Sequence, residues 1–276
     1  AQPREHITCE EEERRRVGFN IETFFSVPDG DMTRVKRARI LSGTDHLLNL
    51  AYIPAAQLIQ VNKGDKSQKE EGFFLDLSTG YWKPKPDPEK PSVNEVRRVQ
   101  ICTHTNADAL YIEPVKSLAL DASGVLSLQY AIKRAIEQVF QIESAELGAT
   151  TMGDKSNPNI FLYEASEGSL GVLSQLATDV DAFRKVIERA IKICNFDDSA
   201  YSEKASYDDL LSYYNQPHHL ILDRFTIRDA LEKLKTCSID LADPSGNRSY
   251  EEQYQWLRKQ IDTSSSTEKK FLNYLH

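Results

Sequence analysis

The spacing of apolar residues changes part-way along this chain, and that change constrains the fold more than any other feature of the sequence. Up to Glu113 the apolar residues lie in short segments separated by turns such as Pro28-Asp29-Gly30 and Lys63-Gly64-Asp65. Segments of this length with this turn chemistry are typical of antiparallel β-strands. From Val125 onward apolar residues also recur every three or four positions, which indicates amphipathic helices. The pattern predicts an α+β protein with a β-rich antiparallel N-terminal part and an α/β part that contains long amphipathic helices.

The individual elements can be placed from the same pattern. Strands are expected over residues 17–27, 34–41, 46–53, 57–62, 72–77, 96–103, 109–113, 146–152 and 159–165. Amphipathic helices are expected over residues 124–143, 170–194 and 226–235. The capping-box patterns Ser249-x-x-Glu252 and Ser265-x-x-Glu268 predict two further helices near the end of the chain.

A proline-rich stretch divides the sequence into two parts. Four prolines between Pro84 and Pro91 hold the chain extended and solvated, and 276 residues are enough for one large or two modest domains. We therefore expect a β-rich subdomain over residues 1–83, a linker or loop over 84–95, an α/β domain over 96–240 and a helical extension over 241–276. The last predicted helix has no stop signal, so we expect the extension to be truncated.

Composition and charge exclude several classes of protein. With 40% hydrophobic and 28% charged residues the chain is close to the globular average, and no apolar run reaches the ~18–20 residues of a membrane-spanning helix. No secretory signal is recognisable, so we expect a cytoplasmic protein. The net charge of −8 argues against attraction of the whole surface to nucleic acid, although local basic patches remain. The cysteines are widely spaced, which favours free thiols over a local zinc clamp.

The common signatures of enzymes are missing from the sequence. Neither Gly64-Asp65-Lys66-Ser67 nor Gly153-Asp154-Lys155-Ser156 has the second glycine and the spacing of a phosphate-binding loop. A nucleophile elbow, a zinc-protease His-Glu-x-x-His pattern and a dinucleotide glycine pattern are also missing. We therefore expect that the chain does not hydrolyse ATP alone and is not an enzyme in isolation.

Two sets of residues are candidates for contact with DNA or a partner. The basic set comprises Arg34, Lys36, Arg37 and Arg39 on one predicted strand, Arg97 and Arg98 on another, and Lys133 and Arg134 on a helix. A solvated sheet edge protected by charge explains the strand residues equally well. The second set is Gly168 and Gly171, at a turn from strand to helix where exposed N–H groups can hold an anion or admit another chain. A tight turn that uses the backbone freedom of glycine is the favoured alternative.

Residues 207–224 form the most crowded polar and aromatic stretch, and no simple helix or strand period explains it. One interpretation is a metal-dependent nuclease or other hydrolase, built on Glu137, Glu146, His218, His219 and Asp223. The alternative is structural. Asp223 and Arg224 would cap the following helix and pair with each other, while the histidines would dock against nearby tyrosines.

Several motifs together resemble one known family. They are Ile160-Phe161-Leu162-Tyr163-Glu164, Glu167-Gly168-Ser169-Leu170-Gly171, the predicted helix that ends at Cys194, the run from Ser206 to Tyr213, Asn215-Gln216 and Leu222-Asp223-Arg224. This combination is similar to the MrfA-type zinc-binding (MZB) domain of bacterial superfamily-2 helicases and of phage-defence proteins such as the DrmB component of DISARM. The likeness extends upstream over most of residues 10–236. It implies an accessory role in DNA repair or antiviral defence, with a helicase motor domain or subunit, and DNA, as partners.

The resemblance also implies a zinc site that this chain does not reproduce. In such relatives several cysteines hold a structural zinc ion. Here Cys194 matches, but Ser206 and Asp209 stand at the last two cysteine positions, and one thiolate cannot make a four-ligand site. We therefore expect no bound metal and an ordered loop held by tyrosines, amides and an Asp223–Arg224 pair. The residues of this degenerate zinc region are Cys194, Ser206, Asp209, Tyr213, Asn215, Gln216, His219, Asp223 and Arg224. A purely structural interaction module remains a further alternative.

Overall fold

The computed structural model divides into two units, residues 1–241 and residues 242–276. It describes residues 18–66, 68, 70–86, 89, 95–154, 157–165, 169–197 and 201–241, together with Tyr254 and Lys270. In the second unit these two residues are helical. Gly168, both predicted capping boxes and most of the proline-rich stretch lie outside the described residues, so the predictions made there stay predictions.

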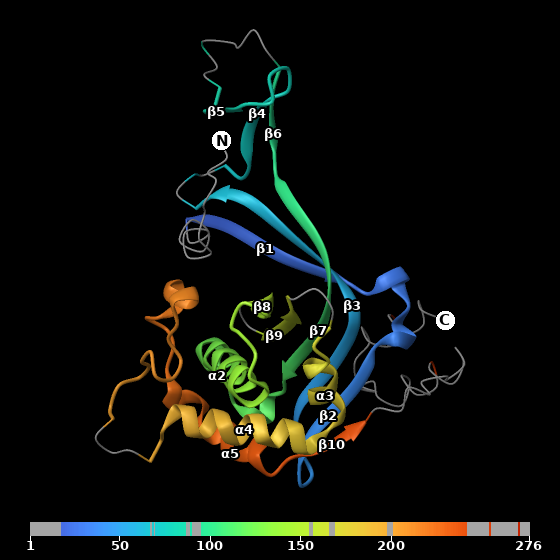
Figure 1. Ribbon diagram of the computed structural model, residues 1–276, viewed down its shortest axis with the longest axis vertical. Coiled ribbons are helices and arrows are strands. Elements are labelled where there is room, and N and C mark those ends of the chain that lie inside the picture. Colours follow the sequence, from blue (N-terminus) through green and yellow to red (C-terminus); the bar gives the residue numbers. More distant parts are fainter. Residues whose placement is uncertain are drawn as a thin grey trace. The chain divides into compact units, whose positions relative to one another are not determined.

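Most strands of the first unit belong to one antiparallel sheet. Its order is β10-β2-β3-β7-β9-β8, and β1 pairs with the second half of β3 (Figure 1). The strands are β1 (Phe19–Ser26), β2 (Lys36–Ser42), β3 (Asp45–Asp65), β7 (Ile101–Pro114), β8 (Leu147–Asp154), β9 (Asn157–Glu164) and β10 (Ser238–Leu241). The expected α+β class with an antiparallel β-rich N-terminal part is confirmed. Strands from both sides of the proline-rich stretch join this sheet, whereas the domain boundaries drawn from the sequence remain predictions.

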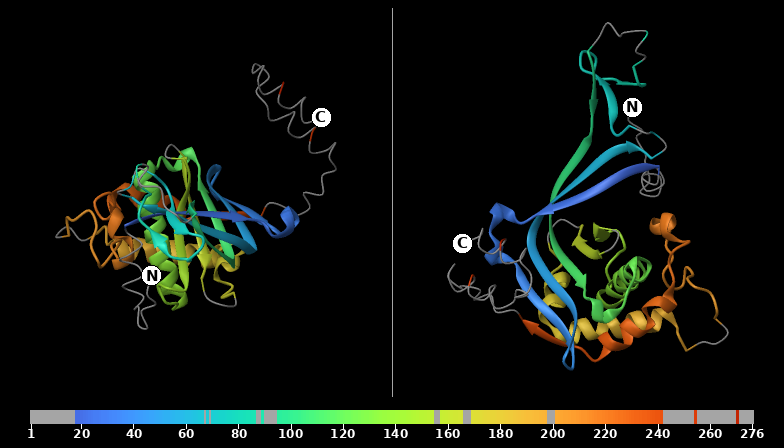
Figure 2. Two further views of the ribbon diagram at one scale, coloured as in Figure 1. Left: turned by 90° about the horizontal axis from the view of Figure 1, so that it is seen from above. Right: turned by 180° about the vertical axis from the view of Figure 1, so that it is seen from behind.

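β3 combines two predicted strands in one element of 21 residues. The pairing with β7 shifts register between Ile53 and Ala56, and Ala55 adopts a φ of 50°. The Asp108 carboxylate fixes this bulge, because it accepts hydrogen bonds from the Ala55 N–H at 2.7 Å and from the Tyr52 hydroxyl at 2.6 Å. Beyond the bulge β1, β3 and β7 continue away from the helices as a ribbon (Figures 1 and 2).

A smaller antiparallel sheet follows the ribbon, with the order β5-β4-β6. Its strands are β4 (Phe73–Asp76), β5 (Trp82–Lys83) and β6 (Val96–Val99). The buried Asp76 carboxylate accepts hydrogen bonds from the Ser78 and Thr79 N–H groups, so it fixes the turn between β4 and β5. Residues 77–81 therefore connect β4 and β5 as a hairpin.

The helices are α2 (Ala122–Phe140), α3 (Val172–Thr178), α4 (Val180–Cys194) and α5 (Arg228–Lys235). Short 3-10 segments lie at η1 (Pro28–Gly30), η2 (Met32–Arg34), η3 (Lys116–Leu118), η4 (Tyr213–His218) and η5 (Arg224–Ile227). Asp121 caps the N-terminus of α2, because its carboxylate accepts from the Gly124 N–H at 2.7 Å. The helix predicted over residues 170–194 is interrupted at Asp179, whose carboxylate accepts from the N–H groups of Asp181 and Ala182 and starts α4.

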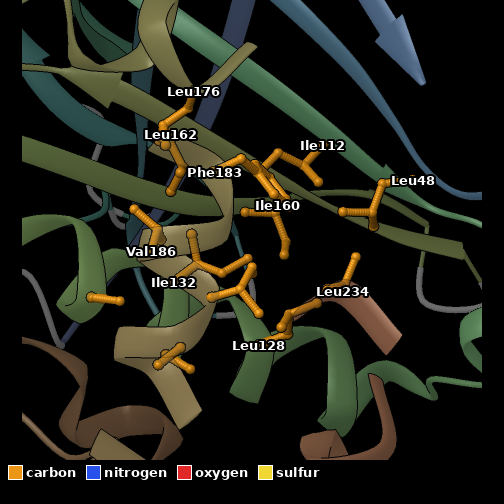
Figure 3. Close-up of a cluster of buried hydrophobic side chains, with 14 of the residues drawn as sticks. Leu48, Ile112, Leu128, Ile132, Ile160, Leu162, Leu176, Phe183, Val186 and Leu234 are labelled. Atoms are coloured by element: carbon orange, nitrogen blue, oxygen red, sulfur yellow. The ribbon is translucent and has the colours of Figure 1, made fainter. Parts of the chain in front are cut away.

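The main core lies between the sheet and α2, α3, α4 and α5. Figure 3 shows apolar side chains from the sheet meeting those of the helices, among them Leu48, Ile112, Leu128, Ile132, Ile160, Leu162, Leu176, Phe183, Val186 and Leu234. All of these are buried, and burial of this kind is the main favourable term in folding. No helix in the described part of the chain is long and apolar enough to cross a membrane.

Candidate functional site: the segment between α4 and α5

One arginine of α2 holds three carbonyls of the segment between α4 and α5. Arg134 donates hydrogen bonds to three main-chain oxygens of this segment, those of Tyr207 at 2.7 Å, Asp209 at 2.8 Å and Leu211 at 3.2 Å. A guanidinium has several N–H donors in a fixed plane, so one side chain can hold successive carbonyls of an irregular loop. Arg134, predicted as a DNA contact, therefore positions residues 207–211 against α2.

A second arginine joins the same segment to the end of α4. Arg224 is fully buried and donates to the carbonyl oxygens of Cys194 at 2.5 Å, Asn195 at 3.0 Å and Glu203 at 2.9 Å. It also donates to the Tyr201 carbonyl. Its guanidinium carbon lies 4.1 Å from the centroid of the Tyr201 ring and 4.2 Å from that of Phe225, so aromatic faces cover the charge.

Asp209 supplies the negative charge of this interior. It is buried, and its carboxylate accepts from the Ser206 N–H at 2.7 Å, from the Leu210 N–H and from the Tyr201 hydroxyl. Burial and the charge of Asp209 raise the pKa of the Cys194 thiol to about 12, with Arg224 acting in the opposite direction. Cys194 is therefore a protonated, buried thiol at neutral pH.

Asn215 organises the turn that follows. Its buried side chain donates to the Leu210 carbonyl at 2.8 Å and accepts from the Ser212 N–H at 2.8 Å. His219 Nε2 lies 2.9 Å from both the Asn215 amide oxygen and the Ser212 carbonyl. The Tyr207 ring meets the His219 ring edge-on at 5.6 Å between centroids. The expected packing of a histidine against a nearby tyrosine is thus present between His219 and Tyr207.

The other residues of the segment contact α2 or lie at the surface. His218 Nδ1 lies 2.8 Å from the Tyr130 hydroxyl of α2, and burial lowers the pKa of His218, with smaller effects from Lys66 and His219. Burial raises the pKa of Tyr130 to about 12. Gln216 is exposed in η4, and its main-chain oxygen accepts from the His219 N–H.

A groove of about 400 Å³ lies between α2 and this segment. We call it the tyrosine groove; it is lined by Tyr130, Lys133, Arg134, Glu137, Gln138, Ser144, Tyr207, Leu210, Leu211, Ser212, Tyr213, Tyr214 and Asn215. The rings of Tyr213 and Tyr214 meet edge-on at 5.8 Å. Lys133 does not present a free charge there, because it pairs with Glu137 and donates to the Ser144 hydroxyl at 2.8 Å.

The stretch from α2 to β10 matches a family model described as the MrfA Zn-binding domain, over residues 128–240. Residues 128–240 are therefore similar to MZB domains, and we refer to this part of the chain as the MZB domain. It contains the segment between α4 and α5, whose main chain binds Arg134 of α2 and the buried Arg224. No curated protein matches the chain in sequence.

Two solved structures are similar to the chain, and both are of the DUF1998 helicase MrfA. The first, bound to DNA, has a TM-score of 0.43 at 11% identity and covers 78% of this chain. The second, bound to DNA and AMPPNP, has a TM-score of 0.27 at 10% identity and covers 65% of this chain. The chain spans 25% and 19% of the length of those two proteins.

The residues of this MZB domain do not fit the zinc ion that the family name implies. Both oxygens of the Asp209 carboxylate accept hydrogen bonds from within the segment, and the Ser206 hydroxyl accepts from the Asp208 N–H at 3.1 Å. In the described ranges no group of three or more His, Cys, Asp and Glu side chains could hold a metal ion. Among the described residues, Cys194 is the single thiol that contributes to this site, whereas structural zinc needs four ligands.

The predicted Asp223–Arg224 pair is replaced by other contacts. Arg224 points into the interior and binds main-chain carbonyls. The Asp223 carboxylate instead pairs with Lys204 at 3.3 Å and accepts from the Phe225 N–H at 3.0 Å, which caps η5 as predicted. The physical reason is that a buried guanidinium needs several acceptors, and the irregular chain before it offers more of them than one carboxylate does.

The predicted basic residues lie at separate places around the MZB domain and the sheet. Arg37 and Arg39 are both exposed on β2, opposite Ala51 and Asn49 of β3. Arg34 lies in η2, and the Lys36 ammonium lies 5.6 Å from the centroid of the Tyr52 ring. Three arginines form ion pairs: Arg39 with Asp240, Arg97 with Glu95 at 2.7 Å, and Arg98 with Glu70 at 3.9 Å. Their role in binding DNA stays a prediction.

The carboxylates and histidines of the hydrolase interpretation each have a different partner. Glu137 pairs with Lys133, and Glu146 accepts from the Glu143 N–H at 2.8 Å. His218, His219 and Asp223 contact Tyr130, Asn215 and Lys204 respectively. The arrangement gives no support to a common catalytic centre.

The turn at Gly171 contains an internal anion that sequence reasoning missed. The buried Glu164 carboxylate accepts from the N–H groups of Leu170 at 2.6 Å, Gly171 at 3.2 Å and Leu173 at 2.9 Å. These N–H groups begin α3, where a negative charge is favoured. The side chain of Glu164 therefore occupies the place that an external anion would take in the less favoured, ligand-binding interpretation of this turn. The acidic residue at the end of the strand Ile160–Tyr163 was the available signal.

Proposed function

We propose that this chain is a non-catalytic accessory part of a DNA helicase system, and that its MZB domain binds the helicase motor domain or subunit through the tyrosine groove and the exposed apolar residues of the segment between α4 and α5. The family match supports an association with helicases, since MrfA is itself described as a helicase. The surface of the segment between α4 and α5 supports binding of a protein.

The observation that carries the proposal is a set of exposed apolar side chains on one short segment. Tyr207, Tyr214, Leu220, Ile221 and Phe225 are all exposed, and Leu220 is completely so. Contiguous exposed hydrophobic surface marks interaction sites, and tyrosine is enriched in protein interfaces. We propose that these side chains, which are close together in sequence, contribute to one such surface.

The segment is also held in one conformation before any partner arrives. Arg134 and Arg224 bind its main chain from two sides, and the buried Asn215 fixes its turn. A surface that is ordered in advance loses less conformational entropy on binding. The position of exposed apolar residues on a well-ordered segment is therefore suited to recognition.

Contact with DNA is the second candidate and rests on β2 and the turn before it. Arg34, Lys36 and Arg37 are exposed there. Other members of the basic set are engaged within the chain, since Arg134 binds carbonyls and Lys133 pairs with Glu137. The protein partner is therefore the better supported of the two, and DNA contact would depend on phosphate binding by a small patch.

Co-purification of the full chain with a superfamily-2 helicase motor of the DUF1998 type tests the proposal. Leu220→Asp and Tyr214→Ala should weaken the complex at least tenfold, because both remove apolar surface from the interface. Leu77→Asp is the matched control, since Leu77 is also an exposed leucine but lies in the turn after β4. Equal binding by Leu220→Asp and the wild type would contradict the proposed surface.

The DNA candidate is tested in parallel by fluorescence anisotropy with single-stranded and double-stranded DNA at low and high salt. Binding that weakens with salt and is lost in the triple variant Arg34→Ala, Lys36→Ala, Arg37→Ala would support contact at β2. The same experiment with Mg²⁺ or Mn²⁺ and labelled DNA measures cleavage. Metal-dependent cleavage that Glu146→Gln abolishes would favour the hydrolase interpretation over both proposals.

A further inference from the structure

In the MZB domain of this chain, a side chain of the protein joins the end of α4 to the segment that follows it. Four carbonyl oxygens converge on the Arg224 guanidinium, two from the C-terminal end of α4 and two from the following residues, Tyr201 and Glu203. In a structural zinc site the metal joins such chain segments through its ligands. Here a cation of the protein lies at the point where the segments meet.

The charges at this point are compensated without a metal ion. Tyr201 contacts both charged groups: its hydroxyl donates to the Asp209 carboxylate, and its ring and carbonyl oxygen contact the Arg224 guanidinium. A buried charge is tolerated when it is paired and fully hydrogen-bonded. Asp209 and Arg224 are each hydrogen-bonded to several groups, and Tyr201 contacts both. A divalent cation beside Arg224 would add uncompensated positive charge.

The hydrogen-bonding groups of the site are also satisfied. Among the described residues, the buried side-chain atom that lacks a partner is Asn159 Oδ1, which lies on β9 and not in this segment. A buried side chain whose natural partner is a metal ion would be an acceptor without a hydrogen-bond donor. The Asp209 oxygens and the Ser206 hydroxyl, at the positions of two family cysteines, all accept N–H or O–H donors.

We infer that this MZB domain is metal-independent: the hydrogen bonds of Asp209 and Ser206, at the positions of two family cysteines, together with the buried Arg224 guanidinium hold the segment that a zinc ion holds in such relatives. The inference does not depend on the proposed partner. It concerns the interactions that fix the conformation of the segment between α4 and α5, and it assigns Arg224 a structural role in them.

Metal analysis of the purified full chain provides the first test. The chain is produced in zinc-supplemented medium and purified without chelator, and its zinc content is measured by mass spectrometry. We expect zinc well below one ion per chain, and a thermal unfolding midpoint that excess EDTA does not change. Close to one zinc per chain, with a lower midpoint in EDTA, would overturn the inference.

Two substitutions distinguish the structural role of the Arg224 guanidinium from that of the Cys194 thiol. Arg224→Met should lower the unfolding midpoint by many degrees or prevent folding, while Arg228→Met, four residues later on the exposed side of α5, should change it little. Cys194→Ala should leave zinc content unchanged and cost only the packing of a small buried side chain. Loss of bound zinc on Cys194→Ala would show a thiolate site and would contradict the inference even if Arg224→Met fails to fold.

Discussion

Arg134 of α2 donates a hydrogen bond to the main-chain oxygen of Asp209 at 2.8 Å. This contact links the first long helix of the MZB domain to a segment more than 70 residues later in the chain. Two more carbonyls of that segment, from Tyr207 and Leu211, accept from the same guanidinium. A basic residue that the sequence presents as a DNA contact thereby becomes part of the support of the proposed binding surface.

Replacing Arg134 with methionine should loosen residues 207–211 without unfolding the domain. Three carbonyls lose a charged donor, so the free energy of unfolding should fall by roughly 1–3 kcal/mol, with water replacing part of the loss at this half-buried position. Hydrogen exchange should become faster in residues 207–215. Arg189→Met is the control, because Arg189 is an exposed arginine that binds the Gln138 side chain. Unchanged exchange in the Arg134 variant would contradict the role of this arginine.

Substitution of Glu164 by glutamine should destabilise the start of α3. The variant keeps the shape of the side chain but removes the charge that accepts from the N–H groups of Leu170, Gly171 and Leu173. We expect a loss of about 1–3 kcal/mol in the free energy of unfolding, measured by chemical denaturation. Glu188→Gln, on the exposed face of α4, should have an effect close to zero. Equal stability of the two variants would refute the internal-anion role of Glu164.

Asp108 should control the bulge in β3. Its carboxylate accepts from the Ala55 N–H, the Tyr52 hydroxyl and the Ser169 hydroxyl, so Asp108→Asn places an amide N–H₂ among donors that need an acceptor. The expected loss of stability is about 1–3 kcal/mol, with faster amide exchange at Ala55. Asn49→Asp, at a half-buried position of β3 outside the bulge, is the comparison: it places a carboxylate beside Glu113 and should lower stability while leaving amide exchange at Ala55 unchanged. Retained protection at Ala55 in Asp108→Asn would contradict this assignment.

Part of the fold could be predicted because it depends on local spacing. The cap of α2 at Asp121 and the hairpin after β4 follow from residues a few positions apart. The bulge in β3 could not be predicted in this way, since its acceptor Asp108 is 53 residues from Ala55. Apolar spacing also continues in phase across Asp179, so the break between α3 and α4 is visible only as a capping residue.

In the candidate site, too, local motifs could be predicted from the sequence, whereas contacts between residues far apart in the chain could not. The family motifs placed Cys194, Asp209, Asn215 and Arg224 in one region, and the structure brings their surroundings together. The acceptors of Arg224 are main-chain oxygens, which exist at every residue and leave no sequence signal. Tyr201 lies outside the quoted motifs, yet it contacts both Asp209 and Arg224. Only the folded chain identifies such residues.

The stability of the domain should depend on pH through His218. Burial, followed by the nearby charges of Lys66 and His219, lowers the folded-state pKa of His218 below the ordinary value of about 6.5. The unfolded chain therefore binds a proton at a higher pH than the folded chain does, so this contribution is fully present above about pH 7. It is lost progressively as the pH falls through about 6.5 towards the folded-state pKa.

Thermal unfolding midpoints between pH 7.5 and 5.5 measure this dependence. His218→Gln should reduce the fall in midpoint over that range, because glutamine does not titrate and can still hydrogen-bond to the Tyr130 hydroxyl. His104→Gln is the matched control, since His104 is exposed on β7 and should retain the pH dependence of the wild type. A fall in midpoint that is identical in His218→Gln and wild type would show that another group is responsible. A reduced slope would place the pH-sensitive contact between α2 and η4, at one end of the tyrosine groove.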